Sequence, residues 1–332
     1  MDVIFLLFVL LSSLLISIAT IASLKKKLFS IGIYGKDINK EGEPKVPEAG
    51  GILLLPAIWI CTLVLIIFFG ANPISYAMLF LISSFCAIGF FDDGFHLFKK
   101  NPNWAFHTLG KGILLLLCAA IFSFIVFTYF GGASAAFFGA GTLLFVLFGT
   151  IIIVLCASFS NSFAGLNGWE VGSSVIIIAG LLVMAIAAPE YTETLLFLCV
   201  IALGAAIGLF FFNRYPAKVF PGDSGTLLLG AFIGAIILFL PLFPLALLLF
   251  IPHFIDIGLK LATNGRDISQ KNERPYGQKG NLLSVPASGR LDFAKLILKL
   301  FGPKTERGLV TIILFLVLLN SFIWCSLYIL LS

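Results

Sequence analysis

The sequence predicts an all-α, polytopic integral membrane protein with about ten transmembrane helices. Of its 332 residues, 60% are hydrophobic and only 11% are charged, and the mean hydropathy of +1.11 lies outside the range of water-soluble domains. The apolar residues also form runs of the roughly 20 residues that a helix needs to cross a bilayer. We expect spans near residues 3–23, 50–70, 74–91, 110–130, 136–157, 170–188, 193–212, 224–241, 243–262 and 308–330.

The first span reads as a retained anchor with the N-terminus outside. No basic residue precedes its apolar run, and Lys25, Lys26 and Lys27 follow it. An external N-terminus and ten spans make five loops cytoplasmic, near residues 24–49, 92–109, 158–169, 213–223 and 263–307.

The charges test this topology independently of hydropathy. Every Lys and Arg falls in one of the cytoplasmic loops or at a helix end that borders one, as the positive-inside bias requires. The outer connections contain no Lys or Arg, namely those near residues 71–73, 131–135, 189–192 and 242. Because the net charge of +5 then sits beside an anionic membrane leaflet, we expect membrane lipids or an anionic substrate as partners, and no nucleic acid.

No repeat, linker or low-complexity tract divides the chain, so residues 1–332 are expected to form a single transmembrane domain. Its longer cytoplasmic loop, at about 263–307, includes an amphipathic stretch from Leu291 to Phe301 that we expect along the membrane surface. The six cysteines lie in or beside apolar segments without C-x-x-C spacing. That pattern indicates buried packing and predicts neither a disulfide nor a zinc site.

Acidic residues stand at two span ends on the cytoplasmic side. Asp92 and Asp93 follow the apolar run that ends AIGFF, where adjacent carboxylates repel each other unless a cation or metal is near. A solvated helix end is the alternative explanation for this pair. Asp223 lies between Gly222 and Ser224 at the start of a span, where it either caps the helix or approaches a metal or phosphate at a glycine turn.

The stretch SFSNSFAGLNGWEVGSS, residues 158–174, is polar but contains no lysine or arginine. Asn161 supplies an amide oxygen, and Gly165 and Gly168 permit a tight turn. Hard oxygen donors of this kind suit Mg²⁺, which combines one or two protein ligands with waters and substrate phosphates. A bound metal would supply the positive charge that the stretch itself lacks.

Two basic residues on the same side, Lys111 and Arg274, are candidate contacts for phosphate or sugar oxygens. Taken singly, each is also explained as a side chain that snorkels to the interface. Together with the carboxylates and the amide, they predict a polar cleft for a phosphorylated, metal-bound ligand.

Six motifs that follow one another along the chain resemble the polyprenyl-phosphate N-acetylhexosamine-1-phosphate transferase superfamily, and within it the dolichyl-phosphate N-acetylglucosamine-1-phosphotransferases. They are YGKDINK, VPEAGG, FFDDGF, NSFAGLNGWEVGSS, NRYPAKVFPGDSG and LKLFGPKTER. The run N-x-x-x-G-x-N-G-x-E joined to Y-P-x-K-V-F-x-G-D is the most specific part. The resemblance implies ten transmembrane helices with a cytoplasmic catalytic face.

For the reacting groups, the resemblance implies that Asn161 and Asp223 bind Mg²⁺. Asp92 and Asp93 would form the acidic pair required for catalysis. Lys111 would contact the pyrophosphate of the donor.

For substrate binding, the resemblance implies that Asn167 and Gly165 hold the uracil end of the donor. Phe220 would stack against the base, and Glu48 would line the nucleotide pocket. Arg274 is the nearest match to the arginine of the loop that recognises the sugar.

The activity implied is transfer of N-acetylglucosamine-1-phosphate from UDP-N-acetylglucosamine to a polyprenyl (dolichyl-type) phosphate, with release of UMP, as the first membrane step of lipid-linked glycan assembly for N-glycosylation. Residues 263–307 contain no histidine, although the muramyl-pentapeptide branch has a histidine cluster there, which argues against a peptidoglycan substrate. Ser158 stands where the eukaryotic branch has an asparagine.

Two other functions remain open at this stage. One is an undecaprenyl-phosphate sugar-1-phosphate transferase of cell-envelope synthesis, which keeps the fold and changes the substrates. The other is a nucleotide-sugar transporter, for which interrupted helices with polar groups near the bilayer midplane would be typical. A homodimer is compatible with either.

Overall fold

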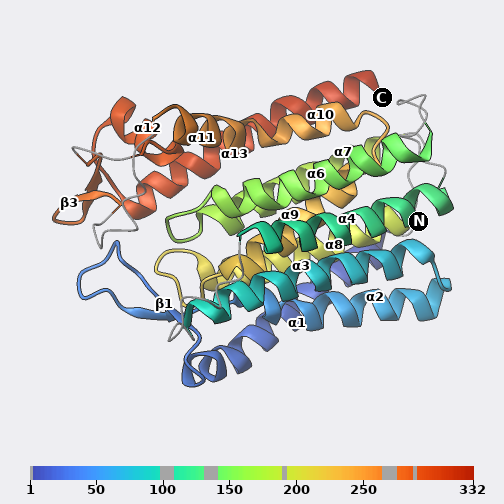
Figure 1. Ribbon diagram of the computed structural model, residues 1–332, viewed down its shortest axis with the longest axis horizontal. Helices are drawn as coiled ribbons and strands as arrows, with labels where there is room; N and C mark the ends of the chain where they lie inside the picture. The colour runs from blue at the N-terminus through green and yellow to red at the C-terminus, as the bar shows by residue number, and fades with distance from the viewer. Residues whose placement is uncertain (1–2, 98–107, 131–140, 189–192, 264–274, 287–289) are drawn as a thin grey trace.

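The protein is a bundle of long helices that lie side by side, as the computed structural model shows in Figure 1. The structure describes residues 3–97, 108–130, 141–188, 193–263, 275–286 and 290–332. The short strands lie at one end of the bundle, and the start of the first helix and the end of the last lie at the other (Figure 1). An even number of crossings places both ends of a chain on one side, as the sequence predicts.

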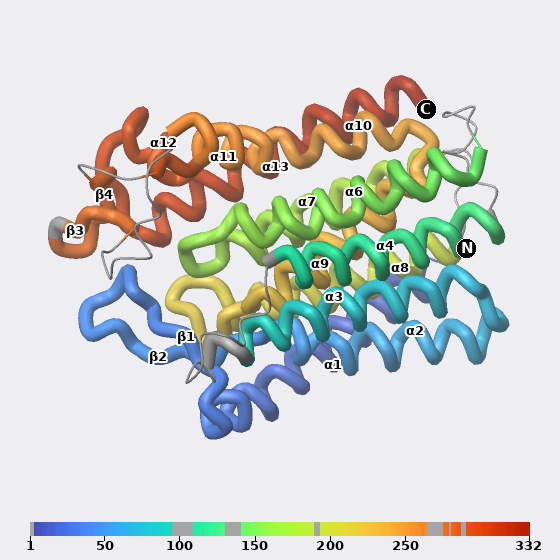
Figure 2. The backbone as a smooth tube through the Cα atoms, in the orientation of Figure 1, coloured from blue at the N-terminus to red at the C-terminus, as the bar shows by residue number. Residues whose placement is uncertain are grey.

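The helices are α1 (Val3–Ser30), α2 (Leu55–Phe69), α3 (Pro73–Leu97), α4 (Thr108–Phe130), α6 (Thr142–Ser162), α7 (Trp169–Ala187), α8 (Glu193–Asn213), α9 (Gly222–Ile237), α10 (Phe243–Leu247), α11 (Ile251–Ala262), α12 (Phe293–Phe301) and α13 (Glu306–Leu331). Short 3₁₀ turns are η1 (Gly50–Leu53) and η3 (Leu248–Phe250). The strands β1 (Tyr34–Lys36) and β2 (Lys45–Pro47) form an antiparallel hairpin, and β3 (Gly277–Lys279), β4 (Leu282–Ser284) and β5 (Lys304–Thr305) form a small sheet (Figure 2).

The predicted fold class is confirmed. Within the described ranges, nine helical segments are long and apolar enough to cross a membrane, and α9 is a shorter apolar helix. Each of the ten predicted spans therefore corresponds to a helical segment. The two small sheets are additions that the sequence did not predict, and which side of the membrane each end faces remains a prediction.

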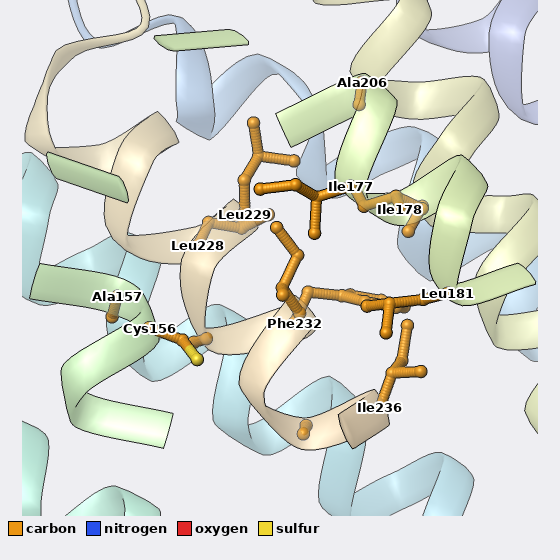
Figure 3. Packing of buried hydrophobic residues seen from close by; sticks show 14 of the residues in the cluster. Cys156, Ala157, Ile177, Ile178, Leu181, Ala206, Leu228, Leu229, Phe232 and Ile236 are labelled. Carbon is orange, nitrogen blue, oxygen red and sulfur yellow. The ribbon is translucent and has the colours of Figure 1, made fainter. Parts of the chain in front are cut away.

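Helix α9 is short because it lies inside the bundle. Every residue from Ser224 to Ile237 is buried, and α3, α6 and α7 pack around it. A Cβ added at Gly230 would lie 2.5 Å from the Cα of Ala157, so α6 and α9 approach at backbone distance. Figure 3 shows Phe232 and Ile236 of α9 beside Leu181 of α7, and Cys156 and Ala157 of α6 on the other side of the α9 ribbon. Since α9 meets protein and not lipid along its length, it need not match the thickness of the hydrocarbon layer.

Several predicted boundaries shift in the structure. The span at 243–262 is divided into α10, η3 and α11, and Pro252 stands in the first turn of α11, where its missing N–H costs no helical hydrogen bond. Helix α6 continues to Ser162, so Asn161 is in a last helical turn and not in a loop. The amphipathic stretch forms α12, with the Asp292 carboxylate accepting a hydrogen bond from the Lys295 N–H at 2.7 Å. All six cysteines are free.

Candidate active site

The segment from the end of β2 to the start of η1 is hydrogen-bonded to the residues before α9. The Phe220 N–H donates to the Pro47 carbonyl at 2.8 Å, and the Gly50 N–H donates to the Phe220 carbonyl at 2.9 Å. The Gly51 N–H donates to the Pro221 carbonyl at 3.1 Å. These bonds join the β1–β2 hairpin to the start of α9, although about 170 residues of chain separate them.

Two glycines let other elements touch the backbone at the start of α9. A Cβ added at Gly51 would lie 2.2 Å from the Gly225 nitrogen, and one added at Gly89 of α3 would lie 2.5 Å from the Asp223 carbonyl carbon. Real Cβ atoms do not approach a neighbouring backbone so closely. The position of Asp223 is therefore set by backbone contacts on two sides.

Asp93 caps α9 from a different helix. Its Oδ1 accepts a hydrogen bond from the Asp223 N–H at 2.7 Å, and its Oδ2 accepts one from the Ser224 N–H at 3.1 Å. Free N–H groups at a helix start favour a carboxylate, through both hydrogen bonding and the helix dipole. Gly222, with a φ of +64°, forms the turn beneath it. The explanation of Asp223 as a helix cap is therefore wrong, because the carboxylate that caps α9 is that of Asp93.

Lys111 pairs with the side chains of the other two aspartates at this position, Asp92 and Asp223. Its Nζ lies 2.7 Å from Oδ2 of Asp92 and also forms an ion pair with Asp223. Lys111 thus joins α4 to α3 and α9. The adjacent aspartates avoid mutual repulsion because Asp92 pairs with this lysine, whereas Asp93 faces the start of α9.

A cavity of about 300 Å³ lies beside this cluster, and we call it the acidic cavity. Six residues with predicted roles line it, from the end of β2, the end of α6, the turn after α6 and the start of α9: Glu48, Asn161, Gly165, Asn167, Phe220 and Asp223. Lys111 and Asp92 do not line the cavity themselves. They are connected to it because Lys111 pairs with both Asp92 and the lining residue Asp223. Of the predicted site residues only Arg274 is not placed, because it lies outside the described residues.

The turn between α6 and α7 is held by hydrogen bonds to distant segments. The Asn167 side-chain amide donates to Oδ2 of Asp37 at 2.9 Å, and its backbone N–H donates to Oε1 of Glu306 at 2.9 Å. The Gly165 carbonyl accepts a hydrogen bond from the Asn39 side-chain amide at 3.1 Å. Only 5% of Asn167 is exposed, so the turn is fixed before any ligand binds.

The acidic cavity carries an excess of negative charge. Four carboxylates line it (Asp37, Glu48, Glu170 and Asp223), against one lining lysine, Lys36. Lysines outside the lining pair with two of them, Lys40 with Asp37 and Lys111 with Asp223, which leaves Glu48 and Glu170. Burial, and secondly the charge of Asp223, raises the pKa of Glu48 above its ordinary value of 4.5. Oε2 of Glu170 is buried and has no hydrogen-bond partner in the described part of the chain. An anionic ligand enters such a site only together with a cation.

The oxygen donors fit a magnesium ion better than a structural metal. Among the residues described, no group of three or more His, Cys, Asp or Glu side chains forms a closed ligand set. The cavity instead offers the Asn161 amide and the Asp223 carboxylate, leaving coordination positions open. Mg²⁺ binds in this manner, keeping waters and substrate phosphates as its other ligands.

Sequence reasoning missed five polar lining residues: Lys36, Asp37, Asn39, Glu170 and Thr226. The first three belong to the YGKDINK motif, to which no roles were assigned. Glu170 ends the N-G-W-E run, and Thr226 lies one helical turn after Asp223. Their positions within recognised motifs were the available signal.

The helical bundle and the oxygen-lined acidic cavity at one end of it define a class of protein, a multi-pass membrane transferase for phosphorylated substrates. Residues 75–240 match glycosyl transferase family 4, and the chain belongs to that family. Membership supports a polyprenyl-phosphate sugar-1-phosphate transferase activity.

Relatives in three organisms cover most of the chain. A Methanocaldococcus jannaschii protein named as a glycosyltransferase is 30% identical over 84% of this chain and 83% of its own length. A Saccharolobus solfataricus protein is named as a UDP-N-acetylglucosamine–dolichyl-phosphate N-acetylglucosaminephosphotransferase. It is 27% identical over 84% of this chain and 87% of its own length. A phospho-N-acetylmuramoyl-pentapeptide-transferase of Limosilactobacillus reuteri is 31% identical over 69% of this chain and 73% of its own length.

Proposed function

We propose that this protein transfers N-acetylglucosamine-1-phosphate from UDP-N-acetylglucosamine to a polyprenyl phosphate of the dolichyl type and releases UMP. The observation that carries the proposal is that six residues with implied roles, Asn161 and Asp223 among them, line one cavity, and that Lys111 is ion-paired with Asp223. A metal ligand set, a cation and a nucleotide pocket are the parts that such a transfer needs.

The charges of the cavity support a magnesium requirement. Both substrates are anions, and the cavity that would receive them is itself acidic. Mg²⁺ on Asn161 and Asp223 would supply charge neutralisation to the transferring phosphoryl group.

The chain's own residues then perform binding and positioning. A lipid phosphate oxygen forms a bond to the β-phosphorus of the donor while the bond from that phosphorus to the UMP oxygen breaks. Lys111, already held at the cavity by Asp92 and Asp223, is placed to stabilise charge on the transferring phosphate. A phosphate monoester has its second pKa near 6, so the attacking oxygen is already ionised at neutral pH. Asp92 therefore orients Lys111 and does not have to act as a strong base.

The nucleoside end of the donor fits the turn between α6 and α7. Asn167 and Gly165 of this turn and Phe220, which precedes α9, all line the acidic cavity, so the base would meet both a hydrogen-bonding turn and an aromatic ring. Glu48 would face the ribose. The basic residues near this end of the bundle support a cytoplasmic location for the reaction.

A second candidate keeps the reaction and changes the substrates to undecaprenyl phosphate and a cell-envelope sugar. The 31% identity to the Limosilactobacillus reuteri enzyme favours it. The absence of histidine from residues 263–307 favours the N-acetylglucosamine donor instead. A transporter is disfavoured because the polar cluster lies at the helix ends.

The test uses purified protein with UDP-N-acetylglucosamine, UDP-N-acetylgalactosamine and UDP-muramyl-pentapeptide, each offered with dolichyl or undecaprenyl phosphate. Mass spectrometry of the lipid product and assay of UMP identify the substrates. We expect UMP release with UDP-N-acetylglucosamine, its loss on chelation, and its recovery when Mg²⁺ is restored. Turnover of the muramyl-pentapeptide donor alone would establish the second candidate, and nucleotide-sugar flux without UMP would establish transport.

The metal assignment is tested by Asp223→Asn and Asn161→Ala. Loss of a metal ligand should lower UMP release by about 10³-fold or more with the fold intact. Glu193→Gln is the matched control, because it removes one exposed carboxylate at the opposite end of the bundle. Near-normal turnover of Asp223→Asn would refute the assignment.

A further inference from the structure

A second cavity, of about 450 Å³, lies behind the turn that carries Asn167, and we call it the basic cavity. The end of α8, the loop after it and the first turns of α13 form its walls. Its charged lining residues are Arg214, Lys218 and Arg307, and no acidic residue of the described ranges lines it. This cavity attracts an anion without the help of a metal.

The three cations have no counter-charge among the residues that the structure describes. All three residues are exposed, and no carboxylate of the described chain lies within ion-pair distance of any of them. The Arg214 guanidinium lies over the Phe211 ring, 5.0 Å from its centroid. Three positive charges around one cavity repel one another, and a bound anion would remove that repulsion.

The cavity becomes apolar with depth. Arg307, Val310 and Leu314 lie on one face of α13, and Leu314 is about 10 Å further along the helix axis than Arg307. On α8, Phe210 similarly stands one turn before Arg214. Both helices are long and apolar enough to span a membrane. The cations are thus at the interface, and the apolar side chains lie toward the hydrocarbon.

We propose that the basic cavity binds an anionic membrane phospholipid, with the lipid phosphate against the three cations and its chain along Phe210, Val310 and Leu314. The matched polarity selects this occupant, because a phospholipid meets the cations with its phosphate and the apolar half of the cavity with its chain, whereas a free inorganic anion meets only the cations. The ligand is neither substrate of the proposed transfer.

The walls of the basic cavity are fixed by hydrogen bonds. The Lys218 N–H donates to the Phe212 carbonyl at 2.7 Å, which folds the loop back onto the end of α8. The Asn213 side chain accepts from the Gly168 N–H at 3.2 Å and donates to the Val219 carbonyl at 3.1 Å. The cation positions therefore rest on an ordered backbone.

The two cavities share one turn. Asn167 lines both, and its N–H is bonded to Glu306, the neighbour of Arg307. A Cβ added at Gly168 would lie 3.1 Å from the Cα of Arg214, so the turn rests on the end of α8. A lipid that immobilises Arg214 and Arg307 stabilises this turn. If the proposed function holds, anionic lipid lowers the KM for the nucleotide sugar.

The binding test counts lipids retained by the full-length protein in native mass spectrometry, after incubation with phosphatidylglycerol or phosphatidylcholine. The cavity variant is Arg214→Gln/Lys218→Gln/Arg307→Gln. The control variant, with Lys26, Lys27 and Lys299 each changed to Gln, loses the same charge at exposed positions elsewhere. We expect the native protein and the control to prefer phosphatidylglycerol, and the cavity variant to lose that preference by at least about tenfold.

Equal phosphatidylglycerol retention by the cavity variant overturns the proposal, as does equal retention of the two lipids by the native protein. Displacement of phosphatidylglycerol by polyprenyl phosphate at equimolar concentration would make the substrate the occupant, and also overturns it. If the triple variant does not fold, a photoreactive phosphatidylglycerol on the native protein replaces it. Labels must then map to residues 210–218 and 307–314, and labels confined elsewhere count against the proposal. None of these measurements needs turnover, so they stand apart from failure of the proposed function.

Discussion

The two cavities at the same end of the bundle hold their cations in opposite ways. Four carboxylates line the acidic cavity, and Lys111 beside it is bound by two carboxylates, one of which, Asp223, is among those four. In the basic cavity, Arg214, Lys218 and Arg307 face one another with no carboxylate among the lining residues. The first cavity takes anions only with an added cation, whereas the second takes them directly.

This difference separates a site for chemistry from a site for membrane lipid. Lysine held by aspartates can exchange partners when a metal and phosphates arrive, because the total charge is then balanced. Unpaired cations above an apolar wall bind a headgroup and change nothing in it. Basic residues that look alike in sequence therefore have different functions, according to the carboxylates that the fold brings to them.

Lys111→Met should have the largest effect on this comparison. Removing the cation leaves Asp92 and Asp223 to repel each other and takes one stabilising charge from the transferring phosphate. We expect kcat to fall by about 10²–10³-fold at any membrane composition, measured as UMP release at saturating substrates. Arg307→Met, the matched change in the basic cavity, should alter activity only as the anionic lipid content is varied. Equal responses of the two variants would abolish the distinction between the cavities.

Asn167→Ala tests the turn that both cavities share. The variant loses the hydrogen bond to the Asp37 carboxylate and should raise the KM for the nucleotide sugar by about tenfold to a hundredfold. Because Asn167 is not among the residues paired with Lys111, kcat should change little. Initial rates over a range of donor concentrations separate the two constants. A fall in kcat with unchanged KM would place Asn167 at the reacting phosphate instead.

Gly89→Ala tests how firmly the acidic cavity is built. The added methyl would meet the backbone of Asp223, and relief of that overlap should destabilise the protein by about 1–3 kcal/mol. Gly94→Ala, on the same helix, has no heavy atom within 4 Å of the new Cβ, and because alanine favours the helix more than glycine it should keep or slightly raise the unfolding temperature. Thermal unfolding in detergent compares the two. Similar midpoints for both variants would show that the backbone contact is easily relieved.

Glu48→Gln should have the smallest effect, a change in thermal stability that is present at neutral and alkaline pH and shrinks at acidic pH. Because burial raises the pKa of Glu48, the native state holds this proton more tightly than the unfolded state. Ionisation of Glu48 therefore costs stability as the pH rises from about 4.5 through the raised value. The neutral variant should melt higher than the native protein at about pH 8, and the difference should shrink at about pH 5. A constant difference across that range would contradict the assignment of the cost to Glu48.

Part of the site was predictable because its signals are local. Asp92, Asn161 and Asp223 each stand at the end of an apolar run, where a polar group is conspicuous in sequence. The resemblance to a known family supplied roles for Asn167, Phe220 and Glu48, which hydropathy does not single out. That these residues share a cavity required the fold, since the hairpin, α6 and α9 contribute to it from separate parts of the chain.

By itself the sequence determined the class of protein, the ten helical segments and the separation of charge between the two ends. These follow from local composition, since each apolar run must satisfy its own backbone hydrogen bonds in lipid and therefore becomes a helix. Only the tertiary structure decided that Asp93 caps a helix beginning 129 residues later. It also decided that, within the described ranges, Lys111 is paired with carboxylates and Arg214 is not. Such pairings depend on which helix ends meet in space, because a charge is stabilised by its neighbours in three dimensions and not by those along the chain.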